Sequence, residues 1–278
     1  MRRPIILFAI IGVLLVAAIG TTLWRYDDAA PAPVPDLAAG PLPVPPFPPR
    51  IASGDAYEQC LAALTDDPDS ARLLADSWAA GGGGDGASHC QGLALIATGQ
   101  PDLGAERLEQ LASSSLAPDK AKAIVFAQAA QARLMAKQPA KARADTTEAL
   151  KLAPDDTEIL IQHAETAEAL EDWKAAIDDL TQALATDPHR ADALVLRAAD
   201  WRRAGHLDLA VRDADRALGI DPDNAEALLE RGIERQRLGD TAGARADWRR
   251  ARALDPNSTT ADLADQNLAL LDAGPNQR

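Results

Sequence analysis

The chain has 278 residues, of which 47% are hydrophobic and only 4% aromatic, and its 28 Lys and Arg against 42 Asp and Glu give a formal net charge of −14. Such a charge repels a phosphate backbone, so the sequence argues against nucleic-acid binding. The apolar residues are largely Ala and Leu, which favours closely packed helices over an all-β domain.

The first segment, residues 1–26, has the pattern of a transmembrane anchor. Residues 5–23 carry no charge, and a helix of about 20 such residues crosses the lipid bilayer. Two arginines precede this run, and Trp24 and Tyr26 follow it, which favours a cytoplasmic N-terminus. The alternative is a signal peptide cleaved near residues 16–18, although such peptides usually have a shorter apolar core. In a bacterium, both interpretations place the folded part in the periplasm, and the first makes the chain a single-pass inner-membrane protein.

Residues 27–50 are predicted to form a linker. Nine of these residues are prolines, a composition that is incompatible with a helix or a central strand. As polyproline II, at about 3.1 Å per residue, the linker would span at most about 70 Å. A stiff spacer and a disordered tether both stay open as interpretations.

A period of 34 residues runs through the second half of the chain. Its marks are one column of prolines and two columns of alanines, at Pro154, Pro188, Pro222 and Pro256, at Ala149, Ala183, Ala217 and Ala251, and at Ala142, Ala176, Ala210 and Ala244. This pattern resembles the tetratricopeptide repeat (TPR), a 34-residue helix-turn-helix unit. The resemblance implies an all-α fold, an α-solenoid, with four repeats within residues 119–256, at 123–154, 157–188, 191–222 and 225–256.

Two further positions of the repeat frame support the resemblance, and one departs from it. Position 8, where the family has a small residue, holds Ala130, Ala164, Ala198 and Gly232, and position 4, where it has a large one, holds Phe126, Leu160, Leu194 and Leu228. Position 11, where the family prefers Tyr, holds Arg133, Ala167, Trp201 and Arg235. We therefore expect the packing at position 11 to differ locally.

Helices are also expected on both sides of the four repeats. Residues 257–278 are predicted to hold a capping helix and a tail, with the helix covering the exposed end of the stack. Residues 51–118 are predicted to hold degenerate TPR-like helices, with 53–66 as a second helix that lacks its first. The further segments are 70–80 and a hairpin of 87–98 and 103–113, for which two registers stay open, with either Ala105 or Cys90 at position 20.

The chain has two cysteines, Cys60 and Cys90. An even number of cysteines in an oxidising compartment favours a disulfide, and alternate helices of a hairpin stack are neighbours. Free buried thiols are the alternative. His89 beside Cys90 raises a third interpretation, a metal site or a Cys–His nucleophile, but neither a fourth metal ligand nor a third catalytic group is identifiable. The sequence therefore predicts a disulfide and no catalytic site, metal or cofactor.

The resemblance also implies where a protein or peptide partner binds. In the family, the first helices of successive units line a concave groove, chiefly through positions 2, 5, 9 and 12. The candidate groove residues in this frame are Ile161, Glu165, Glu168, Val195, Arg202, Arg203, Leu229, Ile233, Gln236 and Arg237. Acidic side chains mark the second repeat and basic ones the third and fourth, which would orient a bound segment. The alternative is that these charges form ion pairs between repeats.

Taken together, the sequence predicts a membrane-anchored TPR scaffold that contacts the lipid bilayer through residues 5–23. Its solenoid would bind partner proteins in the bacterial periplasm or cell envelope. The layout resembles assembly factors for secretion, cell-envelope or cytochrome machineries. A self-associating structural subunit, which would form homo-oligomers, is one alternative. The other is an enzyme with a site near His89 and Cys90.

Overall fold

The computed structural model describes residues 50–274. The predicted anchor, 1–26, and all but the last residue of the predicted linker, 27–50, lie outside these described residues. Within the described range, every regular element is a helix, and none of these helices combines the length and the hydropathy that a membrane span requires.

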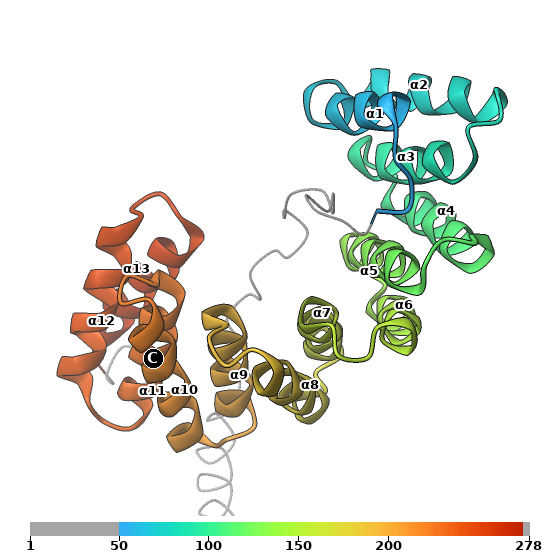
Figure 1. Ribbon diagram of the computed structural model, residues 1–278. Helices are drawn as coiled ribbons and strands as arrows, with labels where there is room; N and C mark the ends of the chain where they lie inside the picture. The colour runs from blue at the N-terminus through green and yellow to red at the C-terminus, as the bar shows by residue number, and fades with distance from the viewer. Residues whose placement is uncertain (1–49, 275–278) are drawn as a thin grey trace, which may run out of the picture. The chain divides into compact units, whose positions relative to one another are not determined.

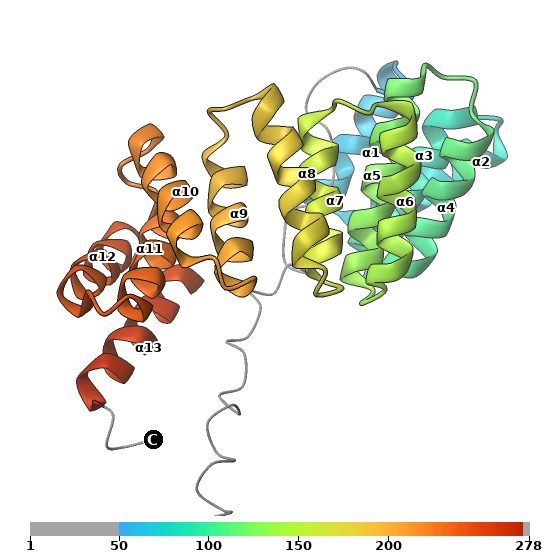
Figure 2. The ribbon, with the colours of Figure 1, turned by 90° about the horizontal axis from the view of Figure 1, so that it is seen from below.

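The described helices follow one another as antiparallel hairpins (Figures 1 and 2). Each first helix of a hairpin packs against its own second helix and, in several cases, against the first helix of the next hairpin, as α9 does against α11. The described residues therefore form an α-solenoid of TPR-like repeats. The helices are α1 (Asp55–Asp66), α2 (Pro68–Ala80), α3 (Gly84–Ala97), α4 (Pro101–Ser114), α5 (Asp119–Met135), α6 (Pro139–Leu152), α7 (Thr157–Glu168), α8 (Trp173–Thr186), α9 (Ala191–Arg203), α10 (Leu207–Ile220), α11 (Ala225–Arg237), α12 (Thr241–Leu254) and α13 (Thr259–Ala273).

Local sequence signals set the ends of these helices. The second helices α6, α8, α10 and α12 each end two residues before a proline of the 34-residue column, because the proline ring disfavours the helical conformation in the residue before it. Asp156, Asn224 and Ser258 cap the N-termini of α7, α11 and α13, and each accepts a hydrogen bond from a backbone N–H three residues later.

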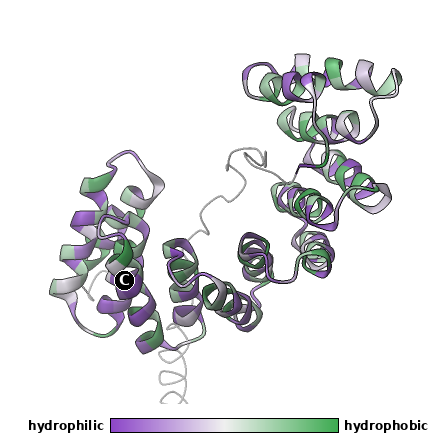
Figure 3. Cartoon of the chain, in the orientation of Figure 1, coloured by the Kyte–Doolittle hydropathy of each residue, from purple (hydrophilic) through white to green (hydrophobic). Residues whose placement is uncertain are grey.

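Small residues bring the helices of each hairpin close together. The eight alanines of the two columns are fully buried, and apolar positions recur along each helix (Figure 3). Gly232 in α11 shows the constraint most clearly, because a Cβ atom there would collide with the indole of Trp248 in α12. Trp248 is itself fully buried and donates from Nε1 to the carbonyl of Leu229 at 3.1 Å.

The first two hairpins are α1 with α2 and α3 with α4, which differs in part from the expected arrangement. Helix α1 packs against α2 and α3, so it takes the place of a first helix and not that of the second helix expected for 53–66. The α3–α4 crossing is made at Gly92 and Gly104, where a Cβ atom on Gly104 would lie 2.7 Å from the Gly92 carbonyl oxygen. These two glycines have the spacing of positions 8 and 20. The register is therefore one residue from that with Ala105 at position 20.

A repeated polar contact joins each of the last three TPR units to the unit before it. We call it the position-7 clasp: a basic residue of the first helix bonds an Asp of its own second helix and a polar residue of the preceding second helix. In one clasp, Arg197 donates to both carboxylate oxygens of Asp213, at 2.7 and 2.9 Å, and to Thr181 Oγ1 at 3.0 Å. The three clasps are Thr147–His163–Asp179, Thr181–Arg197–Asp213 and Asp215–Arg231–Asp247.

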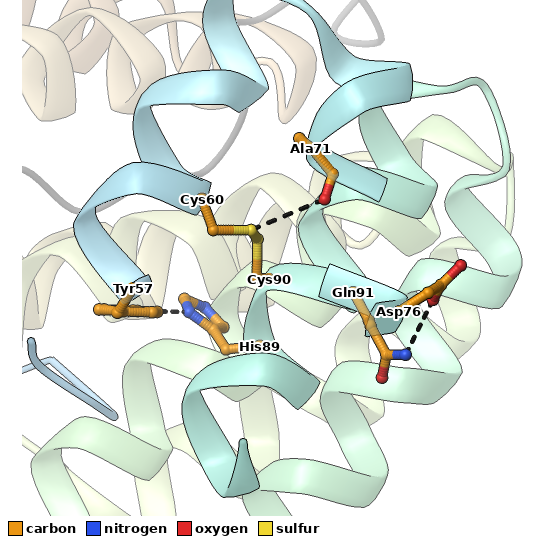
Figure 4. The surroundings of a disulfide bond; sticks show 7 residues. All are labelled: Tyr57, Cys60, Ala71, Asp76, His89, Cys90 and Gln91. Atoms are coloured by element: carbon orange, nitrogen blue, oxygen red, sulfur yellow. Dashed lines mark hydrogen bonds between the residues drawn. A yellow bond between two sulfur atoms is a disulfide. The ribbon is translucent and has the colours of Figure 1, made fainter. Parts of the chain in front are cut away.

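The Cys60–Cys90 disulfide is present and joins α1 to α3, with the two Cα atoms 6.3 Å apart. Both cysteines are fully buried. The residues around this bond, drawn in Figure 4, come from α1, α2 and α3. The bond therefore staples the first two hairpins together.

Replacing both cysteines, as Cys60→Ala/Cys90→Ala, is expected to lower the free energy of unfolding of the first two hairpins by about 3 to 4 kcal/mol, because the bond closes a loop of some 30 residues in the unfolded chain. Hydrogen exchange of the full chain in detergent measures this region by region. Faster exchange is expected in α1–α4 and unchanged exchange in α9–α13. Equal acceleration along the whole solenoid would contradict the local role of the staple.

Replacing Arg197 with Met is expected to cost about 1 to 3 kcal/mol of unfolding free energy, because buried Asp213 loses both of its bonds to the guanidinium. Urea unfolding followed by circular dichroism measures the loss. The matched control is Arg212→Met on α10, an exposed arginine with no hydrogen bond or ion pair within the described residues, expected within about 0.5 kcal/mol of the parent chain. Equal losses in the two variants would show that the clasp is energetically irrelevant.

Candidate partner-binding surface

The predicted groove residues lie on three first helices, α7, α9 and α11. We call this set of ten residues the groove surface. Three of its apolar side chains are buried against neighbouring helices and offer little surface to a partner, since Ile161, Val195 and Leu229 are only 4%, 7% and 6% exposed. Ile233 and Gln236 are half-buried and Arg237 is exposed. A partner on this surface therefore meets mainly polar side chains.

The two basic residues in the middle of the groove surface are held by carboxylates of neighbouring repeats. Arg202 donates to both oxygens of Glu230 in the next repeat, at 2.9 and 3.2 Å. Arg203 lies 3.8 Å from Glu168 in the preceding repeat and 3.3 Å from Asp200. For these residues, the structure has the inter-repeat ion pairs that the sequence left as the alternative. The predicted basic end of the groove is therefore mostly neutralised.

The carboxyl groups of Glu168 and Asp200, from adjacent repeats, lie next to each other beside Arg203. One oxygen of each, Glu168 Oε1 and Asp200 Oδ2, finds no hydrogen-bond partner if both groups are ionised. Burial, followed by the negative charge of Asp200, raises the pKa of Glu168. A single proton on Glu168 satisfies both oxygens, because the protonated carboxyl group can donate to Asp200. The cluster of Glu168, Asp200 and Arg203 is then neutral.

Glu165 lies one helical turn before Glu168. It lines a small hollow between the first two TPR units, and burial, followed by the charges of Glu158 and Asp192, raises the pKa of Glu165 to about 7. No ion pair neutralises it within the described residues. The lining residues of the hollow are Ala130, Gln131, Leu134, Thr146, Gln162, Glu165 and Thr166. Glu165 is therefore the part of the groove surface that retains unbalanced acidic character.

Glu234, at position 10 of the last repeat, is a functional-site candidate that the sequence did not indicate. It is fully buried, and neither of its carboxylate oxygens has a hydrogen-bond partner among the described residues. Burial, followed by the charge of Glu230, raises the pKa of Glu234 from 4.5 to about 9, while Arg202 acts in the opposite direction. Position 10 of the two preceding repeats holds Asp200 and Thr166, which are also fully buried. The signal available in the sequence was this polar column.

The residues around His89 and Cys90 are occupied by structural contacts (Figure 4). The disulfide consumes the Cys90 thiol. His89 Nδ1 lies 2.5 Å from the Tyr57 hydroxyl and Nε2 lies 2.6 Å from Gln128 Oε1. Burial lowers the pKa of His89 to about 4, so the neutral ring accepts from Tyr57 and donates to Gln128. These contacts give no support to an enzyme site at His89, and no cluster of metal-ligating side chains occurs among the described residues.

No protein-family model and no curated protein sequence matches the chain. Among solved structures, the chain is similar to MamA from Desulfovibrio magneticus RS-1, with 15% identity, coverage of 75% of this chain and 99% of the other, and a TM-score of 0.53. It is also similar to YrrB, a TPR protein with an unusual peptide-binding site, with 14% identity, coverage of 77% and 100%, and a TM-score of 0.50. At these identities the likeness shows the fold, which is that of TPR proteins.

Replacing Glu234 with Gln is expected to make the solenoid less sensitive to alkaline pH. The folded chain holds the Glu234 proton up to about pH 9, whereas the unfolded chain releases it near pH 4.5, so the parent chain loses stability as pH rises between these values. Gln has no proton to release, so the variant does not lose stability in this way. We expect equal stabilities at pH 5 and a variant more stable than the parent by at least about 1 kcal/mol at pH 9.

Urea unfolding at pH 5, 7 and 9 measures this difference. Glu226→Gln is the control, because Glu226 lies on the same helix α11 but is exposed. Parallel pH curves for the parent chain and the Glu234→Gln variant would show that Glu234 is ionised in the folded chain.

Proposed function

We propose, from the TPR fold that this chain shares with MamA and YrrB, that it is a non-catalytic scaffold whose groove surface binds a segment of a partner protein. The observation that carries the proposal is the row of half-buried and exposed polar side chains along α7, α9 and α11, which remains open after the helices have packed. YrrB, a TPR protein of similar fold, has a peptide-binding site, which supports peptide binding as a function for a chain of this fold.

The charges left after internal pairing define the partner segment. Glu165 retains acidic character at the second repeat, and exposed Arg237 has no ion pair within the described residues at the fourth. A basic partner side chain beside Glu165 would restore its ionised form, because a nearby cation lowers the pKa of a carboxyl group. The proposed partner therefore places a basic residue at α7 and an acidic or polar one at α11.

The proposed location is the periplasmic face of a bacterial inner membrane, with a single anchor at residues 5–23. The uncharged run, the two arginines before it and the proline-rich stretch after it support this layout. The Cys60–Cys90 disulfide supports an oxidising compartment. A scaffold held there would recruit envelope proteins, in the manner of an assembly factor.

Self-association into a structural envelope subunit is the second candidate function. The sequence feature that favours it is Gly12 and Gly20 within the apolar run, since small residues allow close contact of membrane helices. The mass of the full chain in detergent separates the two candidates. A monomer favours the scaffold, and a defined oligomer favours the structural subunit.

Photo-crosslinking in native membranes tests the scaffold. A photoreactive residue in place of Gln236 on α11 probes the groove surface, and one in place of Arg249 on α12, an exposed residue of a second helix, is the matched control. We expect a defined set of partners from position 236 that is absent from position 249. Identical products at both positions, or only crosslinks between copies of this chain, would overturn the proposal.

Charge reversal then tests the residues. Arg237→Glu is expected to remove the partner crosslinks, because Arg237 belongs to the groove surface, while Arg249→Glu on α12 leaves them. The two variants are matched, since both arginines are exposed and make no ion pair within the described residues. Arg202 and Arg203 are unsuitable for this purpose, because replacing either one also breaks an ion pair between repeats and would destabilise the fold.

A further inference from the structure

A second hollow lies away from the groove surface, between the second helices α2 and α4 and above the first helix α3. It has a volume of about 260 Å³ and is lined by Arg72, Asp76, Gln91, Leu95 and Arg107. We call it the α2–α4 pocket. Its residues belong to the first two hairpins, whereas the groove surface is built from the last three TPR units.

The two arginines of this pocket differ from the other shielded arginines of the described chain. Among described arginines that are partly or fully buried, all except Arg72 and Arg107 lie within ion-pair distance of a carboxylate. Arg72 makes no hydrogen bond or ion pair within the described residues. The two guanidinium groups outnumber Asp76, the one carboxylate that lines the pocket, and so leave a local positive charge in a chain with 42 acidic and 28 basic residues.

Neutral acceptors position Arg107 without cancelling its charge. Arg107 Nη2 donates to Gln91 Oε1 at 2.6 Å and to Ser88 Oγ at 3.3 Å. Gln91 is oriented in turn by its bond to Asp76, at 2.9 Å from Nε2 to Oδ1, which Figure 4 shows. A guanidinium has five N–H donors, so Arg107 keeps donors for a further acceptor.

We propose that the α2–α4 pocket is a second binding site, which takes an acidic side chain of a peptide segment through Arg72 and Arg107. Guanidinium groups match the planar carboxylate and bind it with two parallel hydrogen bonds. Asp76, an exposed residue that also lines the pocket, disfavours a doubly charged phosphate more than a singly charged carboxylate. The site is independent of the proposed groove function.

The apolar neighbours of the pocket specify the residue beside the acid. Leu95 lines the pocket, and Leu103, one turn before Arg107 on α4, is 50% exposed. Residues four apart lie on one face of a helix, so Leu103 flanks Arg107. An acidic residue followed or preceded by an aliphatic one therefore fits the pocket.

Fluorescence anisotropy with the full chain in detergent tests the site. The probe is a fluorescein-labelled hexapeptide of alternating Glu and Leu, with alternating Lys and Leu as the charge control. Binding of the Glu–Leu peptide alone is expected, and it weakens with added salt. Absence of binding, or equal binding of the Lys–Leu peptide, would refute the site.

Arg72→Ala is the decisive variant, because Arg72 makes no hydrogen bond or ion pair within the described residues that the substitution would remove. We expect it to weaken binding by about tenfold, and Arg72→Ala/Arg107→Gln to weaken it further. The control Arg212→Ala/Arg249→Ala removes two exposed arginines from α10 and α12 and is expected to leave affinity unchanged. Equal losses in the two sets would mean non-specific attraction, which overturns the proposal. Displacement of the peptide by inorganic phosphate more readily than by acetate would overturn its selectivity for carboxylates.

Discussion

The position-7 clasp is the interaction on which the regular stacking of the last repeats depends. The core of these repeats is rich in alanine, and a buried Ala removes less apolar surface from water than a buried Leu. Alanine therefore permits close helix packing without fixing one lateral position. The guanidinium of Arg197 or Arg231 binds both oxygens of one Asp and also a polar side chain of the preceding second helix. Few relative positions of the helices satisfy all of these hydrogen bonds. The clasp therefore favours one lateral position of each repeat against the unit before it.

The sequence predicts the helices and the four repeats because their signals are local. Proline columns and small residues at fixed positions act within one hairpin, and a 34-residue period repeats them. The partners of Arg202 and Arg203 were not predictable in this way. These adjacent residues point to opposite repeats, toward Glu230 and Glu168, and the direction of a long side chain does not follow from its position in a repeat frame. Asp179, Asp213 and Asp247 also recur every 34 residues in the sequence, but their pairing with position 7 depends on how the helices cross.

The placement of α1 failed for a related reason. Small residues at helical spacing occur in both helices of a TPR unit, so the alanines of 53–66 did not distinguish a first helix from a second. The contact with α3 makes that distinction, and it also brings Cys60 to Cys90.

Position 10 of the repeat frame shows a further limit of prediction from the sequence. Thr166 satisfies its hydroxyl within its own helix. Asp200 lies beside Glu168 and raises the pKa of that group. Neither carboxylate oxygen of Glu234 has a hydrogen-bond partner among the described residues. The same polar column is thus least satisfied at Glu234 on α11.

The distribution of arginines separates two kinds of surface on this chain. On the groove surface, Arg202 and Arg203 are already bound to carboxylates of the chain itself, so an acidic partner would have to displace Glu230 or Glu168 and would gain little. In the α2–α4 pocket, neither Arg72 nor Arg107 forms an ion pair within the described residues, so an acidic partner displaces no bound carboxylate and gains the charge-assisted hydrogen bonds, although Asp76 nearby weakens them. The disulfide lines neither surface, but it ties α1 to α3, the helix that positions Arg107 through Gln91. A staple at this place holds the pocket in its binding geometry before a ligand arrives, which reduces the entropy lost on binding.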